Sequence, residues 1–282
     1  MAGLGFSLAG LLVGVAVGAT GVGGGSLMTP VLILFYGISP TLAVGTDLLY
    51  AAISKSYGVL LYRRKGAVDW PIVGWQALGS VPAALLTLYV LGRVGPSPGL
   101  DHLIKLVLSI AIIVTACFTL LQETLMLRMR PRVQASAGLS PLPLRLLTIL
   151  AGVLIGTVVT ISSVGAGVIG MMLLIMLYPG RPPIRLVGSD LAHAVLITAI
   201  AGIGHVRLGT VNYSMLLFLL LGALPGIWIG SRIGFRLDPA MLKRSIAVLL
   251  LIVGATTLAK AMTPAKPAAA TASETSTAQP AP

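Results

Sequence analysis

The phrase VGTDLLYA at residues 44–51 places an aspartate, Asp47, in a run of apolar residues, and LVGSDLAHA at residues 186–194 does the same with Asp190. No Lys, Arg, His, Asp or Glu precedes Asp47 in the chain. Each aspartate comes seven residues after a proline that can begin a helix, which at ~1.5 Å per residue places it roughly 10 Å into a bilayer. A charged side chain at the centre of a membrane costs about 2.5 kcal/mol or more, so such residues usually have a partner or line a pathway. The two phrases therefore predict a pair of acids near the middle of the membrane, with either a functional or a structural role.

The composition is typical of a polytopic membrane protein. Of the 282 residues, 56% are hydrophobic and 9% are charged, whereas a soluble domain carries about 25% charged residues. The formal charge of +12 does not indicate a nucleic-acid partner, because the basic residues lie in short loops between apolar segments, where they act as topology signals. The single cysteine, Cys117, lies in an apolar segment and provides neither a disulfide framework nor a thiolate metal motif. We expect a lipid-embedded protein without metal or cofactor.

Apolar runs bounded by glycine, proline and charge predict ten helical segments. They cover about residues 4–20, 25–37, 41–62, 71–92, 103–122, 144–162, 165–178, 184–206, 211–233 and 241–260. The second and seventh are short, at roughly 13 residues where a full span needs about 20, and predict half-helices or re-entrant segments. The first lacks the charged region and cleavage site of a signal peptide, so we expect it to remain as a membrane helix. The expected fold is all-α.

The two halves of the chain are related in sequence. TGVGGGSLMTPVLILFY at 20–36 aligns with SSVGAGVIGMMLLIMLY at 162–178, and the aspartate phrases follow after a one-residue insertion. The register then holds through RRKGAVDW at 63–70 against VRLGTVNY at 206–213. A separation of 142 to 143 residues, kept over some 65 positions, indicates a duplication.

An odd number of segments in each half predicts that the second half enters the membrane upside down, as in the inverted repeats of secondary transporters. We assign residues 1–122 to the first repeat, 123–143 to a basic cytoplasmic linker, 144–260 to the second repeat and 261–282 to a disordered tail. With the linker in the cytoplasm, 13 basic residues lie on that side and 5 on the other. Both termini then lie on the non-cytoplasmic side of the inner membrane.

Two glycine-rich stretches, GVGGGS at 21–26 and SSVGAG at 162–167, separate the first two segments of each half. Backbone amides without side chains can approach a ligand closely, and a helix that starts directly afterwards favours an anion. The candidate anion-binding residues are Gly23, Gly24, Gly25, Ser26, Ser162, Ser163, Gly165 and Gly167. The alternative is that small residues only permit close packing of helices.

Polar side chains near the aspartates complete the predicted site. Thr46 and Ser189 precede the acids and could donate hydroxyls to an oxyanion or only to the backbone. His193 follows Asp190 by three residues and could exchange protons with it or form a helix–helix hydrogen bond. Lys55 could supply positive charge to the anion or extend to the cytoplasmic surface. The acids themselves are candidates for proton coupling or for holding unwound backbone in place.

The motifs GVGGGSLMTP, AVGTDLLYAAISK, VGAGVIGMMLLI and LVGSDLAHA resemble those of the sulfite exporter TauE/SafE family, also called the toluene sulfonate uptake permeases. The resemblance covers about residues 4–259 and implies an inner-membrane secondary carrier of sulfite, sulfoacetate or other sulfur-containing anions. The chain departs from the family pattern in two places. Many members have serine where the acid follows Gly-Thr here, and the second glycine cluster is reduced to Gly165-Ala166-Gly167.

The expected function is transport of a small oxyanion, with sulfite or an organosulfonate as the leading substrate, by alternating access and with proton coupling as a hypothesis. The chain is not expected to be an enzyme. An intramembrane aspartyl protease that uses Asp47 and Asp190 is the alternative from another class, and an anion channel is a third. The expected partners are the anion and the lipid bilayer, and a homodimer is left open.

Overall fold

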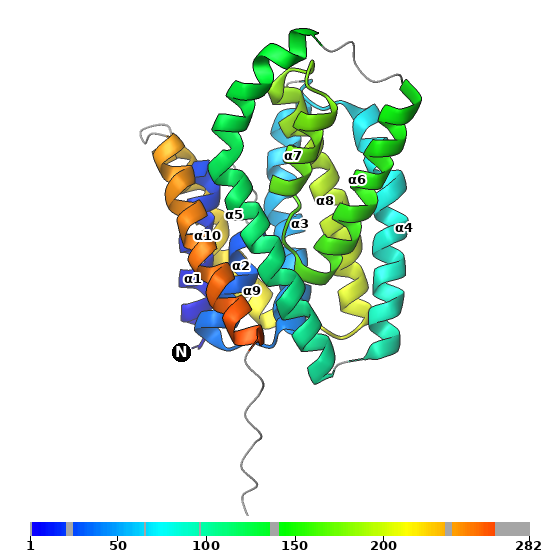
Figure 1. Ribbon diagram of the computed structural model, residues 1–282. Coiled ribbons are helices and arrows are strands. Elements are labelled where there is room, and N and C mark those ends of the chain that lie inside the picture. Colours follow the sequence, from blue (N-terminus) through cyan, green and yellow to red (C-terminus); the bar gives the residue numbers. More distant parts are fainter. Residues whose placement is uncertain are drawn as a thin grey trace, which may run out of the picture.

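The computed structural model describes residues 2–20, 25–64, 66–95, 97–135, 141–234 and 239–262. These residues form ten α-helices and no strand (Figure 1). The helices are α1 (Ala2–Thr20), α2 (Gly25–Tyr36), α3 (Pro40–Arg64), α4 (Trp70–Val94), α5 (Pro98–Ala135), α6 (Pro141–Ser162), α7 (Val168–Leu177), α8 (Pro183–Arg207), α9 (Tyr213–Gly234) and α10 (Pro239–Met262). The all-α fold class expected from the sequence is confirmed.

Six helices of the described part are long and apolar enough to cross a membrane, namely α4, α5, α6, α8, α9 and α10. α3 has 25 residues but carries Asp47 and Lys55. In contrast, α2 has 12 residues and α7 has 10, so at ~1.5 Å per residue each is about half as long as the bilayer core. α2 lies in the lower half of the bundle in Figure 1 and α7 in the upper half. The two short helices therefore enter from opposite ends.

The predicted segments match the ten helices one for one, with a large difference only at α5. That helix continues to Ala135, so the predicted linker begins inside it. The physical reason is local, because QETLMLRMR at 122–130 consists mainly of good helix formers and contains no glycine or proline. At the other end of the chain, α10 reaches Met262, and the rest of the predicted tail lies outside the described residues.

Close helix packing depends on glycines at four-residue spacing. Gly10, Gly14 and Gly18 of α1 lie directly against the backbone of α9, and Gly222, Gly226 and Gly230 of α9 lie against that of α1. Gly152 and Gly156 of α6 approach the backbone of Gln76 and Ser80 in α4 in the same way. A methyl group at any of these positions would overlap the facing backbone, as expected where small residues let membrane helices approach.

The principal contacts between the two halves form a symmetric set. The first helix of each half packs on the fourth of the other, α1 on α9 and α6 on α4, while α3 packs on α8 and α5 on α10. α8 is the most buried of the six candidate spans, and it packs against α3 and α4. α1 begins and α10 ends at the same end of the bundle (Figure 1).

Candidate substrate site at the helix breaks

Asp47 connects α3 to the short helix α2. Its side chain is fully buried, and its Oδ2 atom accepts hydrogen bonds from the Thr29 amide, at 3.2 Å, and from the Thr29 hydroxyl. Thr29 precedes Pro30 inside α2, where the missing amide of proline already interrupts the helical hydrogen bonds. The carboxylate therefore anchors the half-helix, which is the structural role considered for this acid.

The break between α6 and α7 faces the same carboxylate. Ser163, Gly165 and Gly167 have φ angles of 59°, 104° and 123°, so the chain turns through three left-handed residues between the two helices. The Ser163 hydroxyl interacts with Asp47, and neither it nor Asp47 Oδ1 has another hydrogen-bond partner among the described residues. Buried polar atoms are normally paired, and here the carboxylate and the hydroxyl face each other across the break.

Lys55 supplies a positive charge to this break. Its side chain is 4% exposed, and its ammonium donates a 2.8 Å hydrogen bond to the carbonyl of Ala166, between Gly165 and Gly167. The ammonium also interacts electrostatically with Asp190 and, less strongly, with Asp47. Lys55 therefore points into the protein toward the α6–α7 break and does not extend to the surface.

Asp190 approaches α7 from α8. It is 5% exposed, and a methyl group on Gly170 of α7 would overlap its Oδ1 atom, so the carboxylate packs directly on the α7 backbone. Its charge partner is Lys55, as it is for Asp47. We call Asp47, Lys55, Ser163 and Asp190 the central cluster. It brings both predicted acids and the predicted lysine together at the α6–α7 break.

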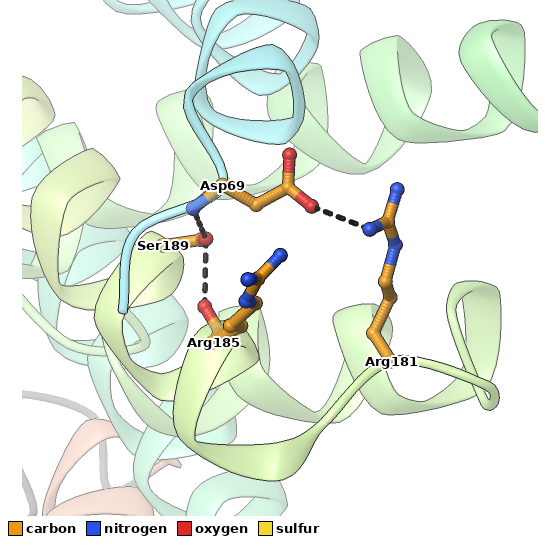
Figure 2. Close-up of polar contacts among 4 residues, drawn as sticks. All are labelled: Asp69, Arg181, Arg185 and Ser189. Atoms are coloured by element: carbon orange, nitrogen blue, oxygen red, sulfur yellow. Dashed lines mark hydrogen bonds and ion pairs between the residues drawn. The ribbon is translucent and has the colours of Figure 1, made fainter. Parts of the chain in front are cut away.

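The two hydroxyls that precede the acids make matching contacts elsewhere. Thr46 Oγ1 donates to Leu42 O at 2.8 Å and accepts from the amide of Asn212 at 3.1 Å. Ser189 Oγ donates to Arg185 O at 2.7 Å and accepts from the amide of Asp69 at 2.8 Å (Figure 2). Asp69 and Asn212 are equivalent in the sequence repeat. Each hydroxyl thus attaches a loop of the other half, and its predicted role in substrate binding stays a prediction.

Asp69 also forms an ion pair that was not expected from the sequence. Its Oδ2 atom lies 3.3 Å from Arg181, which is 49% exposed and precedes α8 (Figure 2). The pair joins the start of α4 to the α7–α8 connection. Asn212 has no charge, so the equivalent loop of the second half lacks this contact.

His193 faces α4. Its Nε2 atom is 2.8 Å from the hydroxyl of Ser80, and the ring is 1% exposed. Gln76, one turn before Ser80 on the same face of α4, is fully buried with no hydrogen-bond partner for either side-chain amide atom among the described residues. Neither Gln76 nor Ser80 was expected from the sequence. The only sequence signal for Gln76 was that it is an amide in an otherwise apolar segment and aligns with the apolar Leu219 of the other half.

The remaining predicted residues lie at the two breaks. Ser162 ends α6, where its hydroxyl donates to Val158 O at 2.7 Å and accepts from the Val164 amide at 3.2 Å, which gives it a local capping role. Gly25 begins α2, followed by Ser26, whose side chain is outside the described part, as are Gly23 and Gly24. The described residues contain no group of three or more His, Cys, Asp or Glu that could bind a metal.

Comparisons with known proteins agree on one family. The model of the family described as "Sulfite exporter TauE/SafE" matches residues 6–257. The probable membrane transporter protein YjnA of Bacillus subtilis (strain 168) is 37% identical over 250 residues, which cover 88% of this chain and 96% of YjnA. The probable membrane transporter protein YdhB of the same organism is 27% identical over 247 residues, 86% of this chain and 95% of YdhB. No solved structure matches. The chain belongs to the sulfite exporter TauE/SafE family.

Proposed function

We propose that this protein is a secondary transporter of small oxyanions, with sulfite or an organosulfonate as the leading substrate, and that the anion binds at the central cluster. The observation that carries the proposal is the Lys55 ammonium, which is buried at the α6–α7 break, bonds to the Ala166 carbonyl and interacts electrostatically with two buried acids. A buried cation among broken membrane helices is costly and usually marks a substrate or ion pathway. The family name and the names of both relatives support a transporter.

The charges of the cluster support coupling to protons. With both acids ionised, Asp47, Lys55 and Asp190 together carry one negative charge, and an added oxyanion would be repelled. A proton on one acid leaves the cluster neutral, and the ammonium is then available to the anion. In this proposal the proton and the anion bind together, and both cross the membrane in the same direction.

Alternating access would use the two halves as moving parts. Their matching contacts support an inverted repeat, because Thr46 binds the Asn212 amide and Ser189 binds the equivalent Asp69 amide. The short helices α2 and α7 lie in opposite halves of the bundle (Figure 1), and each contacts one acid of the cluster, α2 through Thr29 and α7 through Gly170. A rearrangement of the halves about α3 and α8 would expose the cluster first to one side and then to the other.

The contacts do not favour the aspartyl protease alternative. Such enzymes need two carboxylates that share a proton. Here each acid has Lys55 as its charge partner, and Asp47 Oδ2 is occupied by Thr29. A channel differs from a carrier in kinetics, since a carrier shows saturation and counterflow.

The test is uptake by purified protein in proteoliposomes. We expect saturable uptake of sulfite or sulfoacetate that is stimulated by an inward proton gradient and by counterflow from preloaded vesicles. Sulfate and acetate in the same assay define selectivity. Uptake that is linear with concentration and shows no counterflow would show that the protein is a channel and not a carrier. No uptake of any of these anions would refute the oxyanion proposal.

A further inference from the structure

One contact surface has opposite chemistry in the two halves. In the first, Tyr50 of α3 packs in an apolar cluster with Leu219 and Ala223 of α9. The sequence repeat aligns these residues with His193 of α8 and with Gln76 and Ser80 of α4. The aromatic, aliphatic and methyl side chains of one surface are thus an imidazole, an amide and a hydroxyl on the other.

Helix packing alone does not require the polar side chains of Gln76 and Ser80. Both surfaces are buried, and Leu219 and Ala223 fill the positions of Gln76 and Ser80 in the other half, so the helix contact does not need an amide and a hydroxyl there. The hydroxyl of Tyr50 on that surface has no hydrogen-bond partner among the described residues either. Ser80 and His193 bond to each other, but the Nε2 and Oε1 atoms of Gln76 have no partner in the described chain. Burying an unpaired polar group costs about 1–3 kcal/mol. A partner from outside the chain would offset this cost.

The two polar atoms of the Gln76 amide require different groups in such a partner. Nε2 donates hydrogen bonds and Oε1 only accepts them, so a ligand that satisfies both must carry an acceptor and a donor. An oxyanion with one remaining proton has both, in an oxygen and an O–H group. A fully ionised oxyanion or an alkylsulfonate has no donor and would leave Oε1 buried and unpaired.

We infer that Gln76, together with the Ser80–His193 pair, is a specificity-determining site that selects the monoprotonated form of the transported oxyanion. This inference rests on the proposed function. The site adjoins the central cluster through α8, where Asp190 and His193 are three residues apart on neighbouring positions of the helix surface. The amide recognises the proton that the anion carries, and the ammonium of Lys55 recognises its charge.

The test compares hydrogensulfite with methanesulfonate, a sulfonate that has no O–H group, in proteoliposomes at pH 6. We expect the wild-type protein to prefer hydrogensulfite by about 10-fold or more in kcat/KM, the ratio that corresponds to one buried unpaired acceptor. In Gln76→Leu, which copies the residue of the other half, the preference should fall to about 2-fold or less while uptake of methanesulfonate persists. Leu219→Met at the equivalent position is the matched control and should keep the wild-type preference.

The other possible results refute either the inference or the proposed function. A wild-type protein that transports both anions without preference, or a Gln76→Leu variant that keeps the preference, would refute the inference and leave the proposed function intact. Equal losses for both anions in Gln76→Leu would assign Gln76 a structural role only. Absence of uptake by the wild-type protein would refute the proposed function itself. Should Gln76→Leu fail to fold, Gln76→Met, which keeps the length of the side chain, serves in the same assay.

Discussion

The two buried aspartates occupy equivalent positions, but their surroundings differ. Asp47 accepts two hydrogen bonds from Thr29 and anchors α2 to α3. At the position of Thr29 the second half has Met171, and Asp190 instead packs on Gly170 with Lys55 as its charge partner. Asp47 thus meets the short helix of its half through direct hydrogen bonds, whereas Asp190 meets α7 by packing on a glycine. We therefore expect Asp47 to act mainly in architecture and Asp190 to act in the proposed proton coupling.

Lys55 is the largest difference between the halves, because its counterpart is Thr198, a buried hydroxyl that bonds to Ala194 O within α8. We expect Lys55→Met to lower oxyanion uptake by about 30-fold or more, since removing one partner of a buried charged group costs about 2–5 kcal/mol. Initial uptake rates in proteoliposomes measure this. The control, Thr198→Val, should stay within about 3-fold of wild type. Uptake by Lys55→Met at the wild-type rate would exclude the lysine from the substrate site.

Exchanging each acid for its amide tests the division of roles. Asp190→Asn should abolish stimulation of uptake by a proton gradient while counterflow at equal pH persists, because the variant cannot take up the coupled proton. Asp47→Asn keeps an oxygen that accepts from Thr29, so gradient stimulation should persist. Thermal unfolding of both purified variants provides the folding control. The division of roles is wrong if Asp47→Asn, and not Asp190→Asn, loses the response to the gradient.

Gly170 explains how closely Asp190 can approach α7. In Gly170→Ala the added methyl group would overlap Asp190 Oδ1, so the carboxylate must shift away from its position beside Lys55. Overpacking of this kind costs about 1–3 kcal/mol, and we expect uptake to fall by roughly 10-fold with a lower Tm. Gly180→Ala is the matched control, since no atom lies within 4 Å of the added methyl group. Equal effects of the two substitutions would show that Asp190 is not held against α7.

The helices and their half-length members could be predicted because their signals are local. Apolar runs end at prolines and charges, and α2 and α7 follow glycine clusters that interrupt them. The direction of the Lys55 side chain depends on the rotation of α3 against the α6–α7 break, which no local pattern encodes. Likewise, Thr46 and Ser189 bind loops from the other half of the chain, so their partners follow from tertiary packing.

Loss of the ion pair between Asp69 and Arg181 should have the smallest effect on stability (Figure 2). The equivalent loop functions with the neutral Asn212, whose amide makes the same contact to Thr46 without any ion pair. Arg181 is half exposed, and such pairs contribute about 0–1 kcal/mol. Arg181→Gln should therefore lower Tm by less than about 4 °C at low salt and by less still at high salt, with uptake unchanged. Ser189→Ala should have the larger effect, because it removes the buried acceptor of the Asp69 amide. A greater loss in Arg181→Gln would mean that the ion pair, and not the repeated hydroxyl contact, attaches this loop to α8.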